Sequence, residues 1–262
     1  MTELRKTFDG VAELYDRVRP TYPEALFDEL FSRLPDSPDV LEVGPGTGQA
    51  TGSLLKRNAR VTAVELGSNM AERLRQKYVD EDQLKIVVSS FEDVPVTVHS
   101  LDLVIAATAY HWIEESVRLV KPFDLLRRDG WLAIIETVNI SSPADAGFSE
   151  RSQVVYDKYF DDADEPRQPL AHEVTGFMFD ALEKSPLYAS PQRYMYPWDQ
   201  TNDAETFGDL LRSYSSNQAM PEVQREAFVD EMIRLVNDEF GGFVTQPIVI
   251  VLTMAQPAHY SV

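Results

Sequence analysis

Residues 40–49 read VLEVGPGTGQ and carry three glycines at alternate positions, Gly44, Gly46 and Gly48. Glycine has no Cβ, so such a loop turns tightly and lets a ligand approach its backbone. Residues 40–43 form a short, mostly apolar run of the kind that precedes such loops as a buried strand. Open α/β sheets bind ligands at the carboxyl ends of their strands, so this loop is predicted to hold a ligand.

The residue after this loop distinguishes between classes of nucleotide-binding site. A dinucleotide-binding loop of the form G-x-G-x-x-G needs a third glycine where this chain has Gln49. A P-loop needs a lysine after its glycines, and none follows here. The pattern favours a nucleoside without a pyrophosphate and makes a nicotinamide-dependent oxidoreductase a distant alternative.

Glu65 stands nineteen positions after Gly46, at the end of the next apolar run. An acidic side chain at this place can accept hydrogen bonds from both hydroxyls of a ribose. The alternative is an acid favoured by the dipole at a helix N-terminus. Position and spacing together favour ribose binding.

Periodicity predicts the elements that position these residues. Expected strands are 40–43, 60–64, 84–88, 101–107 and 131–137, and expected helices are 24–34, 49–57, 69–78 and 111–126. Pro122 should interrupt the last helix, and Asp129-Gly130 should form a turn before the last strand. Strands alternating with helices imply βαβ units and a parallel sheet.

The regular alternation of predicted strands and helices ends near residue 141. Helical periodicity is expected over 141–185, 202–214 and 222–240, an extended segment over 187–198 and an apolar strand over 243–254. Gly241-Gly242 should end the last helix. We expect one domain over 1–262, with an N-terminal helical segment 1–34, a cofactor-binding core 35–140, a substrate lid 141–240 and a final strand segment 241–262.

Five segments in order, 40–49, 61–65, 90–93, 101–104 and 125–132, resemble the class I S-adenosylmethionine-dependent methyltransferases, although Asp129 stands where the family often has glycine. The resemblance covers about residues 35–138. Further matches are similar to small-molecule methyltransferases such as the trans-aconitate enzymes; they are Phe8-Asp9, Tyr15, Arg19-Pro20, Tyr22-Pro23 and His111-Trp112. The resemblance implies a doubly wound, Rossmann-like α/β fold. Its seven-stranded sheet would be mostly parallel with the last strand antiparallel, and a helical cap would follow strand five.

The resemblance also implies roles for individual residues around S-adenosyl-L-methionine. The three glycines would pack against its methionine and ribose portions, and Glu65 would hold the ribose hydroxyls. The other cofactor-binding candidates are Glu42, then Leu66 and Met70 beside the adenine, Ser90, Phe91 and Glu92 after the third strand, and Ala106 and Thr108 near the methyl group. Many relatives carry an acid at the position of Ser90, which is a weaker acceptor.

Methyl transfer is an in-line displacement that depends mainly on alignment of nucleophile, methyl and sulfur. His111 is the candidate base because an unperturbed His titrates near neutrality. The alternative is that His111 and Trp112 pack behind the cofactor. Arg19, with Tyr15 and Tyr22, could grip a carboxylate of the substrate or cofactor, or could be a surface arginine among half-buried tyrosines. Among the lid aromatics Tyr194, Tyr196, Trp198, Phe207 and Tyr214, Trp198 is the substrate-site prediction.

The 262 residues include 24 basic and 43 acidic side chains, which gives a net charge of −19. Such acidity disfavours nucleic acid and anionic membrane as partners. The acidic run 161–165 is expected to be a solvated loop. Twenty acids and eight bases fall within 145–240, so the lid is expected to disfavour multiply anionic substrates.

The chain has no cysteine, and its four histidines are scattered at 99, 111, 172 and 259, so no metal site is expected. It shows neither a signal peptide nor an apolar run long enough for a bilayer. We therefore expect a cytoplasmic monomer or homodimer that acts on a small-molecule acceptor. The alternative is a non-catalytic protein of the same fold that binds S-adenosylmethionine or another nucleoside for regulation.

Overall fold

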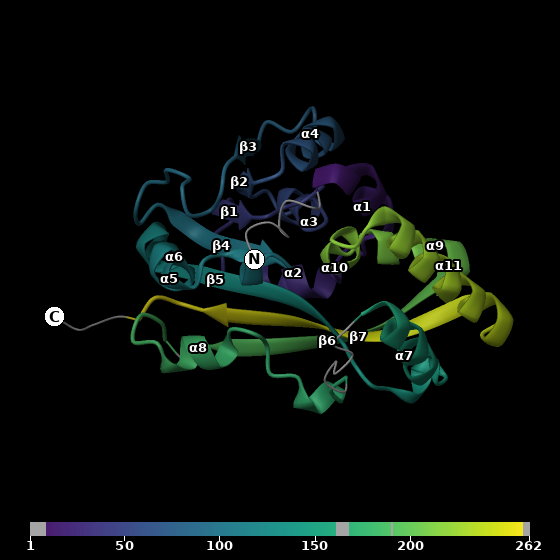
Figure 1. Cartoon of the computed structure of the whole chain (residues 1–262). Helices are drawn as coiled ribbons and strands as arrows, with labels where there is room; N and C mark the ends of the chain where they lie inside the picture. The colour runs from purple at the N-terminus through teal and green to yellow at the C-terminus, as the bar shows by residue number, and fades with distance from the viewer. Residues whose placement is uncertain (1–8, 161–167, 190, 259–262) are drawn as a thin grey trace. The chain divides into compact units, whose positions relative to one another are not determined.

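The computed structural model describes residues 9–160, 168–189 and 191–258 (Figure 1). Seven strands form one sheet in the order β3-β2-β1-β4-β5-β7-β6. The strands are β1 (Asp39–Val43), β2 (Arg60–Glu65), β3 (Leu84–Val88), β4 (Leu101–Ala107), β5 (Leu126–Asn139), β6 (Gln192–Asp203) and β7 (Phe243–Ala255). The first four lie within one residue of their predicted bounds, because each is a short apolar run between turn residues.

The sheet is parallel from β3 to β5 and antiparallel at β7. β1 pairs in parallel with β2 and β4, β2 with β3, and β4 with β5. β7 runs opposite to its neighbours: Tyr188 and Pro257 form an antiparallel bridge, and Thr201 hydrogen-bonds Thr245 at 2.9 Å. The predicted mostly parallel, seven-stranded Rossmann-like sheet with an antiparallel last strand is therefore confirmed.

The chain divides into two compact units, and the boundaries at 136/137, 196/197 and 249/250 fall within β5, β6 and β7. The core unit consists of Pro20–Glu136, Thr175–Tyr196 and Ile250–Val262, and the helical unit of Met1–Arg19, Thr137–Val174 and Pro197–Val249. The one-domain division expected from the sequence stays a prediction.

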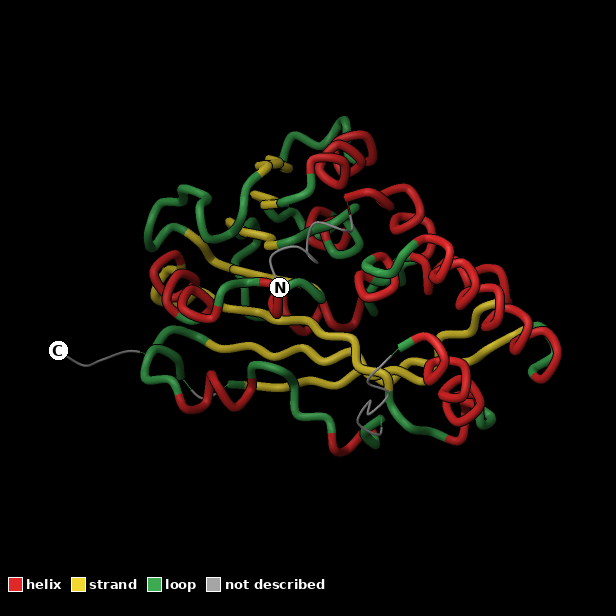
Figure 2. The backbone as a smooth tube through the Cα atoms, in the orientation of Figure 1, coloured by secondary structure: helices red, strands yellow, loops and turns green. Residues whose placement is uncertain are grey.

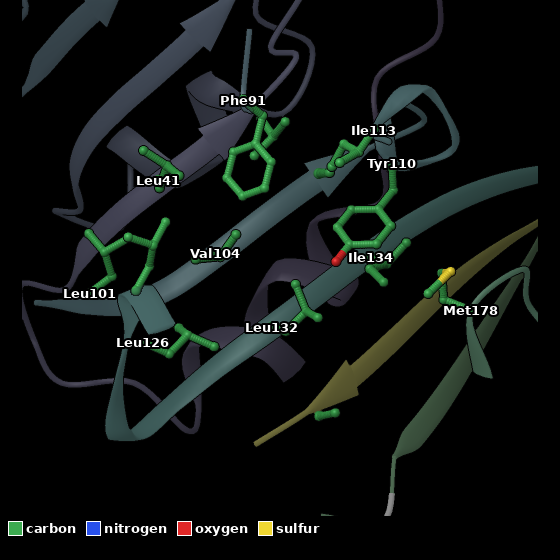
Figure 3. Close-up of a cluster of buried hydrophobic side chains, with 14 of the residues drawn as sticks. Leu41, Phe91, Leu101, Val104, Tyr110, Ile113, Leu126, Leu132, Ile134 and Met178 are labelled. Carbon is green, nitrogen blue, oxygen red and sulfur yellow. The ribbon is translucent and has the colours of Figure 1, made fainter. Parts of the chain in front are cut away.

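The core unit carries helices on both faces of its strands. Its helices are α2 (Glu24–Phe31), α3 (Thr51–Leu55), α4 (Ser68–Lys77), the 3-10 turn η2 (Tyr110–Trp112), α5 (Glu115–Arg118), α6 (Val120–Leu125) and α8 (Phe179–Lys184). Side chains alternate along a strand. Leu41 of β1 therefore joins the buried cluster with Val104, Tyr110 and Met178 (Figure 3), whereas Glu42 contacts Thr51 of α3.

Helices predominate in the helical unit (Figure 2). They are α1 (Ala12–Val18), η3 (Pro143–Asp145), α7 (Phe148–Tyr159), η4 (Ala171–Glu173), α9 (Ala204–Arg212), α10 (Ser215–Gln218) and α11 (Glu222–Glu239). Their core includes Phe148 and Phe207, whose rings meet edge to face at 5.4 Å, and Phe228 of α11. Gly241 and Gly242 have positive φ, which confirms the predicted end of α11.

Three local predictions were wrong. Asp129-Gly130 is no turn before a strand, because β5 already begins at Leu126 and accommodates both residues in a register shift against β4. Residues 111–126 are not one helix with a single interruption: they break at 113–114 and again at Leu119, between α5 and α6, and Pro122 lies in the first turn of α6, where proline is tolerated. The helix predicted from 202 begins at Ala204, because Asp203 ends β6 and its carboxylate accepts the Thr206 N–H at 2.7 Å.

Candidate functional site

The loop after β1 has the glycine geometry that its sequence predicts. Gly44, Gly46 and Gly48 have φ values of +64°, +59° and +94°. Any Cβ on Gly44 would lie 2.6 Å from the Ala109 Cβ, and one on Gly48 would lie 2.7 Å from Leu74. Gly44 therefore combines a left-handed backbone with a lack of room, whereas at Gly48 the left-handed backbone is the main constraint, because the close Leu74 atom is the end of a flexible side chain.

Glu65, the last residue of β2, is hydrogen-bonded to this loop. Its exposed fraction is 9%. One carboxylate oxygen accepts the Gly46 N–H at 3.0 Å, and the other accepts the Gly67 N–H at 2.8 Å. Gly67 is the N-cap residue of α4, so the two bonds fix the carboxylate between the glycine loop and the start of that helix. The spacing from Gly46 predicted this proximity.

A second carboxylate, Glu42, is buried in β1 two residues before Gly44. The Thr51 hydroxyl donates to its Oε2 at 2.7 Å. Its Oε1 is buried and has no hydrogen-bond partner among the described residues. Burial raises the pKa of Glu42 to about 7; the Thr51 bond opposes this shift, and the nearby charge of Glu65 adds to it. The loop thus has two buried carboxyl groups and favours a cation over an anion.

The segment after β3 contains Asp93, which was not among the predicted site residues. The Ser90 hydroxyl donates to Asp93 Oδ2 at 2.7 Å and accepts the Asp93 N–H at 3.1 Å. Ser90 therefore positions a carboxylate three residues later, and the S-x-x-D spacing was the signal for it. Phe91 is buried beneath the Lys121 ammonium, 5.3 Å from its ring centre, and Glu92 accepts the Glu114 N–H at 3.0 Å.

The predicted adenine neighbours lie at the start of α4. Met70 is buried in its first turn, and half-buried Leu66 directly follows Glu65. Both therefore adjoin the segment that fixes the Glu65 carboxylate. The structure keeps these predicted residues together with the glycine loop within the core unit.

The carboxyl end of β4 is strained. Thr108 has φ +51°, which is rare for a β-branched residue. Its hydroxyl donates to Ala107 O at 2.8 Å and lies 3.0 Å from the Tyr22 hydroxyl. Ala106 is fully buried beside this turn. Strain of this kind persists where the surroundings enforce it and clusters at functional sites.

His111 lies in the exposed turn after Thr108, and its ring centre is 4.6 Å from that of Trp112. Arg118 donates to the His111 carbonyl at 2.9 Å. Although the residue as a whole is exposed, neighbouring atoms desolvate its imidazole ring; this desolvation and, secondarily, the Arg118 cation lower the pKa of His111, so the neutral ring predominates at pH 7. Neutral imidazole can accept a proton, as the predicted base must.

Two further residues meet here that the sequence did not indicate. Glu136 in β5 accepts the Phe177 N–H with both oxygens, at 2.9 and 2.7 Å. The Phe177 ring lies 5.2 Å from the Arg118 guanidinium. Burial raises the pKa of Glu136, and the Phe177 bond opposes the shift. No local pattern signals this pair, because the bond uses a backbone N–H that any residue type provides.

The remaining predicted substrate residues belong partly to the helical unit. There Arg19 lies between the rings of Tyr15 and Tyr214, at 4.9 and 4.5 Å, and donates to the Ser213 hydroxyl and carbonyl at 2.9 Å each. Trp198 is half-buried in β6. Tyr22 belongs to the core unit.

Metal and membrane features can be judged over the described residues. No group of three or more potential metal-ligating side chains occurs within residues 9–160, 168–189 and 191–258. None of the helices in these ranges is long and apolar enough to span a bilayer. The acidic run 161–165, Phe8 and His259 lie outside the described residues.

Comparisons with known proteins agree with this geometry. Residues 41–134 match the methyltransferase domain family. An uncharacterised methyltransferase of Mycobacterium tuberculosis is 30% identical over 133 residues, or 51% of this chain and 53% of the relative. A malonyl-[acyl-carrier protein] O-methyltransferase of Acetivibrio thermocellus is 26% identical over 90% of this chain and 83% of the relative.

A solved phosphoethanolamine N-methyltransferase 2 of Haemonchus contortus, in complex with phosphomonomethylethanolamine and S-adenosylhomocysteine, has the same fold. Its TM-score is 0.53 at 12% identity, over 95% of this chain and 58% of that one. The chain spans about half the length of the first mycobacterial relatives that it matches. Residues 41–134 are thus similar to the methyltransferase domain family, in agreement with the class I resemblance of the sequence.

Proposed function

We propose that this protein transfers a methyl group from S-adenosyl-L-methionine to an oxygen, nitrogen or carbon nucleophile of a small molecule. The hydrogen bonds from the Gly46 and Gly67 N–H groups to the Glu65 carboxylate carry the proposal. They fix an acceptor for a ribose beside a glycine loop, in a segment similar to the methyltransferase domain family, and a solved protein of the same fold holds S-adenosylhomocysteine. When bound, S-adenosylmethionine supplies a methyl group already activated on a sulfonium.

The residues present fit this cofactor. Two buried carboxyl groups, Glu42 of β1 and Glu65 of β2, flank the loop, and the Glu42 Oε1 has no hydrogen-bond partner within the described part of the chain; these groups suit a cationic nucleoside. Gly44, Gly46 and Gly48 would hold its methionine and ribose portions. Leu66 and Met70 would flank the adenine, with Ser90, Phe91 and Glu92 at its edge, and Ala106 and Thr108 would lie toward the methyl group.

Replacing Glu65 by alanine should weaken the binding of S-adenosylhomocysteine by about 1–3 kcal/mol, the range for lost buried hydrogen bonds. That corresponds to a roughly 5- to 150-fold higher Kd by calorimetric titration. Glu81→Ala, at an exposed glutamate of the same unit, is the control and should leave the Kd unchanged. Equal affinity of the Glu65 variant and the parent would refute the site.

Catalysis would depend on alignment, with His111 as the base for acceptors that must lose a proton. Because its pKa lies below the usual value, turnover should rise with pH only below about 6.5 and stay level near neutrality. His111→Gln should remove this acidic limb and lower turnover about 10²-fold. A smaller loss with an unchanged pH profile would favour the packing role with Trp112.

The acceptor is proposed to be a neutral, cationic or singly anionic small molecule, because 145–240 is strongly acidic. In the helical unit the proposed acceptor contacts are Arg19, Tyr15 and Trp198, and in the core unit they are Tyr22 and Trp112. We further propose a cytoplasmic protein, monomeric or homodimeric, without nucleic-acid or membrane partners. The test is methyl-labelled cofactor with a panel of phenols, amines, carboxylates and carrier-bound acids. Tight cofactor binding without transfer to any of them would favour the regulatory alternative.

A further inference from the structure

The helical unit contains a cavity of about 360 Å³. Its walls come from the end of β5, from α7, from the start of α10 and from the first half of β7. Every lining residue belongs to the helical unit. The volume lies within the range of small-molecule sites.

The described part of the cavity wall is almost uncharged at neutral pH. Asp145 is the single charged side chain among the described lining residues, although twenty acids and eight bases lie within 145–240. The Asp145 oxygens already accept the Gly147 and Ser149 N–H groups, at 2.8 and 3.4 Å. Within residues 9–160, 168–189 and 191–258, no cation lines the cavity to balance an anion, and burial of an unpaired carboxylate is costly. The wall therefore favours a neutral ligand.

The cavity offers hydrogen-bonding groups that the protein itself does not use. Among the residues that the structure describes, the side-chain amides of Asn139 and Gln246 and the hydroxyl of Tyr214 have no hydrogen-bond partner. An amide both donates and accepts, and a tyrosine hydroxyl does the same. Three groups of this kind around one cavity suit a ligand with several hydroxyl, carbonyl or amide groups.

Aromatic rings give the cavity its apolar part. Phe148 and Phe207 are buried and pack edge to face with each other. Tyr214 carries the Arg19 guanidinium 4.5 Å from its ring centre, which together with the bonds of Arg19 to Ser213 holds that ring in place. A rigid aromatic wall favours a ligand with a ring of its own.

We propose that this cavity is a binding site for a neutral small molecule with an apolar ring that bears hydroxyl, carbonyl or carboxamide groups. The site requires no cofactor and does not depend on methyl transfer. The protein would thus have a second ligand site besides the glycine loop of the core unit, one that favours a neutral ligand rather than a cation.

The probes are three matched pairs in which a neutral carboxamide, which donates and accepts, is replaced by an anionic carboxylate, which only accepts: nicotinamide and nicotinate, salicylamide and salicylate, and 4-hydroxybenzamide and 4-hydroxybenzoate. Binding to the full chain is measured by ligand-observed NMR titration at pH 7.5. At least one carboxamide should bind saturably, and its carboxylate partner about tenfold or more weakly. Gln246→Leu should weaken the carboxamide about 3- to 10-fold, as expected for one hydrogen bond, and Gln246→Glu should weaken both members.

The matched controls are Gln200→Leu and Gln200→Glu, at a half-buried glutamine of β6 that does not line the cavity. They should leave binding unchanged. Thermal melts establish that all variants fold. The proposal is overturned if no carboxamide binds, if the carboxylates bind equally well, or if the Gln200 variants weaken binding as much as the Gln246 variants do.

Discussion

Replacing Gly44 by alanine should destabilise the protein by about 2–5 kcal/mol. A left-handed backbone costs a residue with a Cβ about 1–2 kcal/mol. Gly44 has φ +64°, and its Cβ would also lie 2.6 Å from the Ala109 Cβ, a contact that must be relieved. Overpacking of this kind costs about 1–3 kcal/mol more. Urea denaturation, followed by circular dichroism, measures the difference in the free energy of unfolding.

Gly241→Ala is the matched control for this variant. Gly241 has nearly the same φ, +65°, and its Cβ would meet no atom within 4 Å. Alanine there should cost only the backbone term of about 1–2 kcal/mol. Equal losses at both positions would mean that Ala109 does not constrain the loop.

Replacing Glu42 by glutamine should change the pH dependence of stability by about 3 kcal/mol. Burial raises the pKa of Glu42 from 4.5 to about 7 in the folded protein. Between these values the folded state holds a proton that the unfolded state has lost, so stability falls as pH rises. A shift of this size corresponds to about 3 kcal/mol, which is lost by pH 7 and regained below pH 4.5.

Glutamine cannot ionise, and its oxygen can still accept the Thr51 hydroxyl. The free energy of unfolding of Glu42→Gln should therefore fall less between pH 4.5 and 7.5 than that of the parent, with the variant more stable at pH 7.5. Glu81→Gln, at an exposed site, should reproduce the parent profile. Parallel profiles for the Glu42 variant and the parent would show that Glu42 is ionised in the folded protein.

Local patterns were sufficient for the core of the fold. β3 and β4 match their predicted bounds because each is one apolar run between turns. The relation of Glu65 to Gly46 was predictable because adjacent parallel strands bring their carboxyl ends to one edge of the sheet. β6 was harder to predict, since this long edge strand alternates exposed and half-buried residues and lacks a continuous apolar run.

Other parts of the site depend on contacts that no local pattern reports. Glu136 and Phe177 meet across 41 positions of sequence, and their bond uses a backbone N–H that any residue type provides. The cavity of the helical unit combines Asn139 and Gln246, which are more than one hundred positions apart. Phe207 and Tyr214 were among the aromatic candidates of the predicted lid, but Trp198 does not line this cavity.

The central claim is that S-adenosylmethionine binds at the glycine loop and Glu65. Hydrogen–deuterium exchange of the full chain, with and without S-adenosylmethionine, tests it most directly, because the amides of Gly46 and Gly67 both bond to Glu65. We predict slower exchange over residues 44–48 and 65–70 when the cofactor is present. Unchanged exchange over both segments at saturating S-adenosylmethionine would contradict the claim.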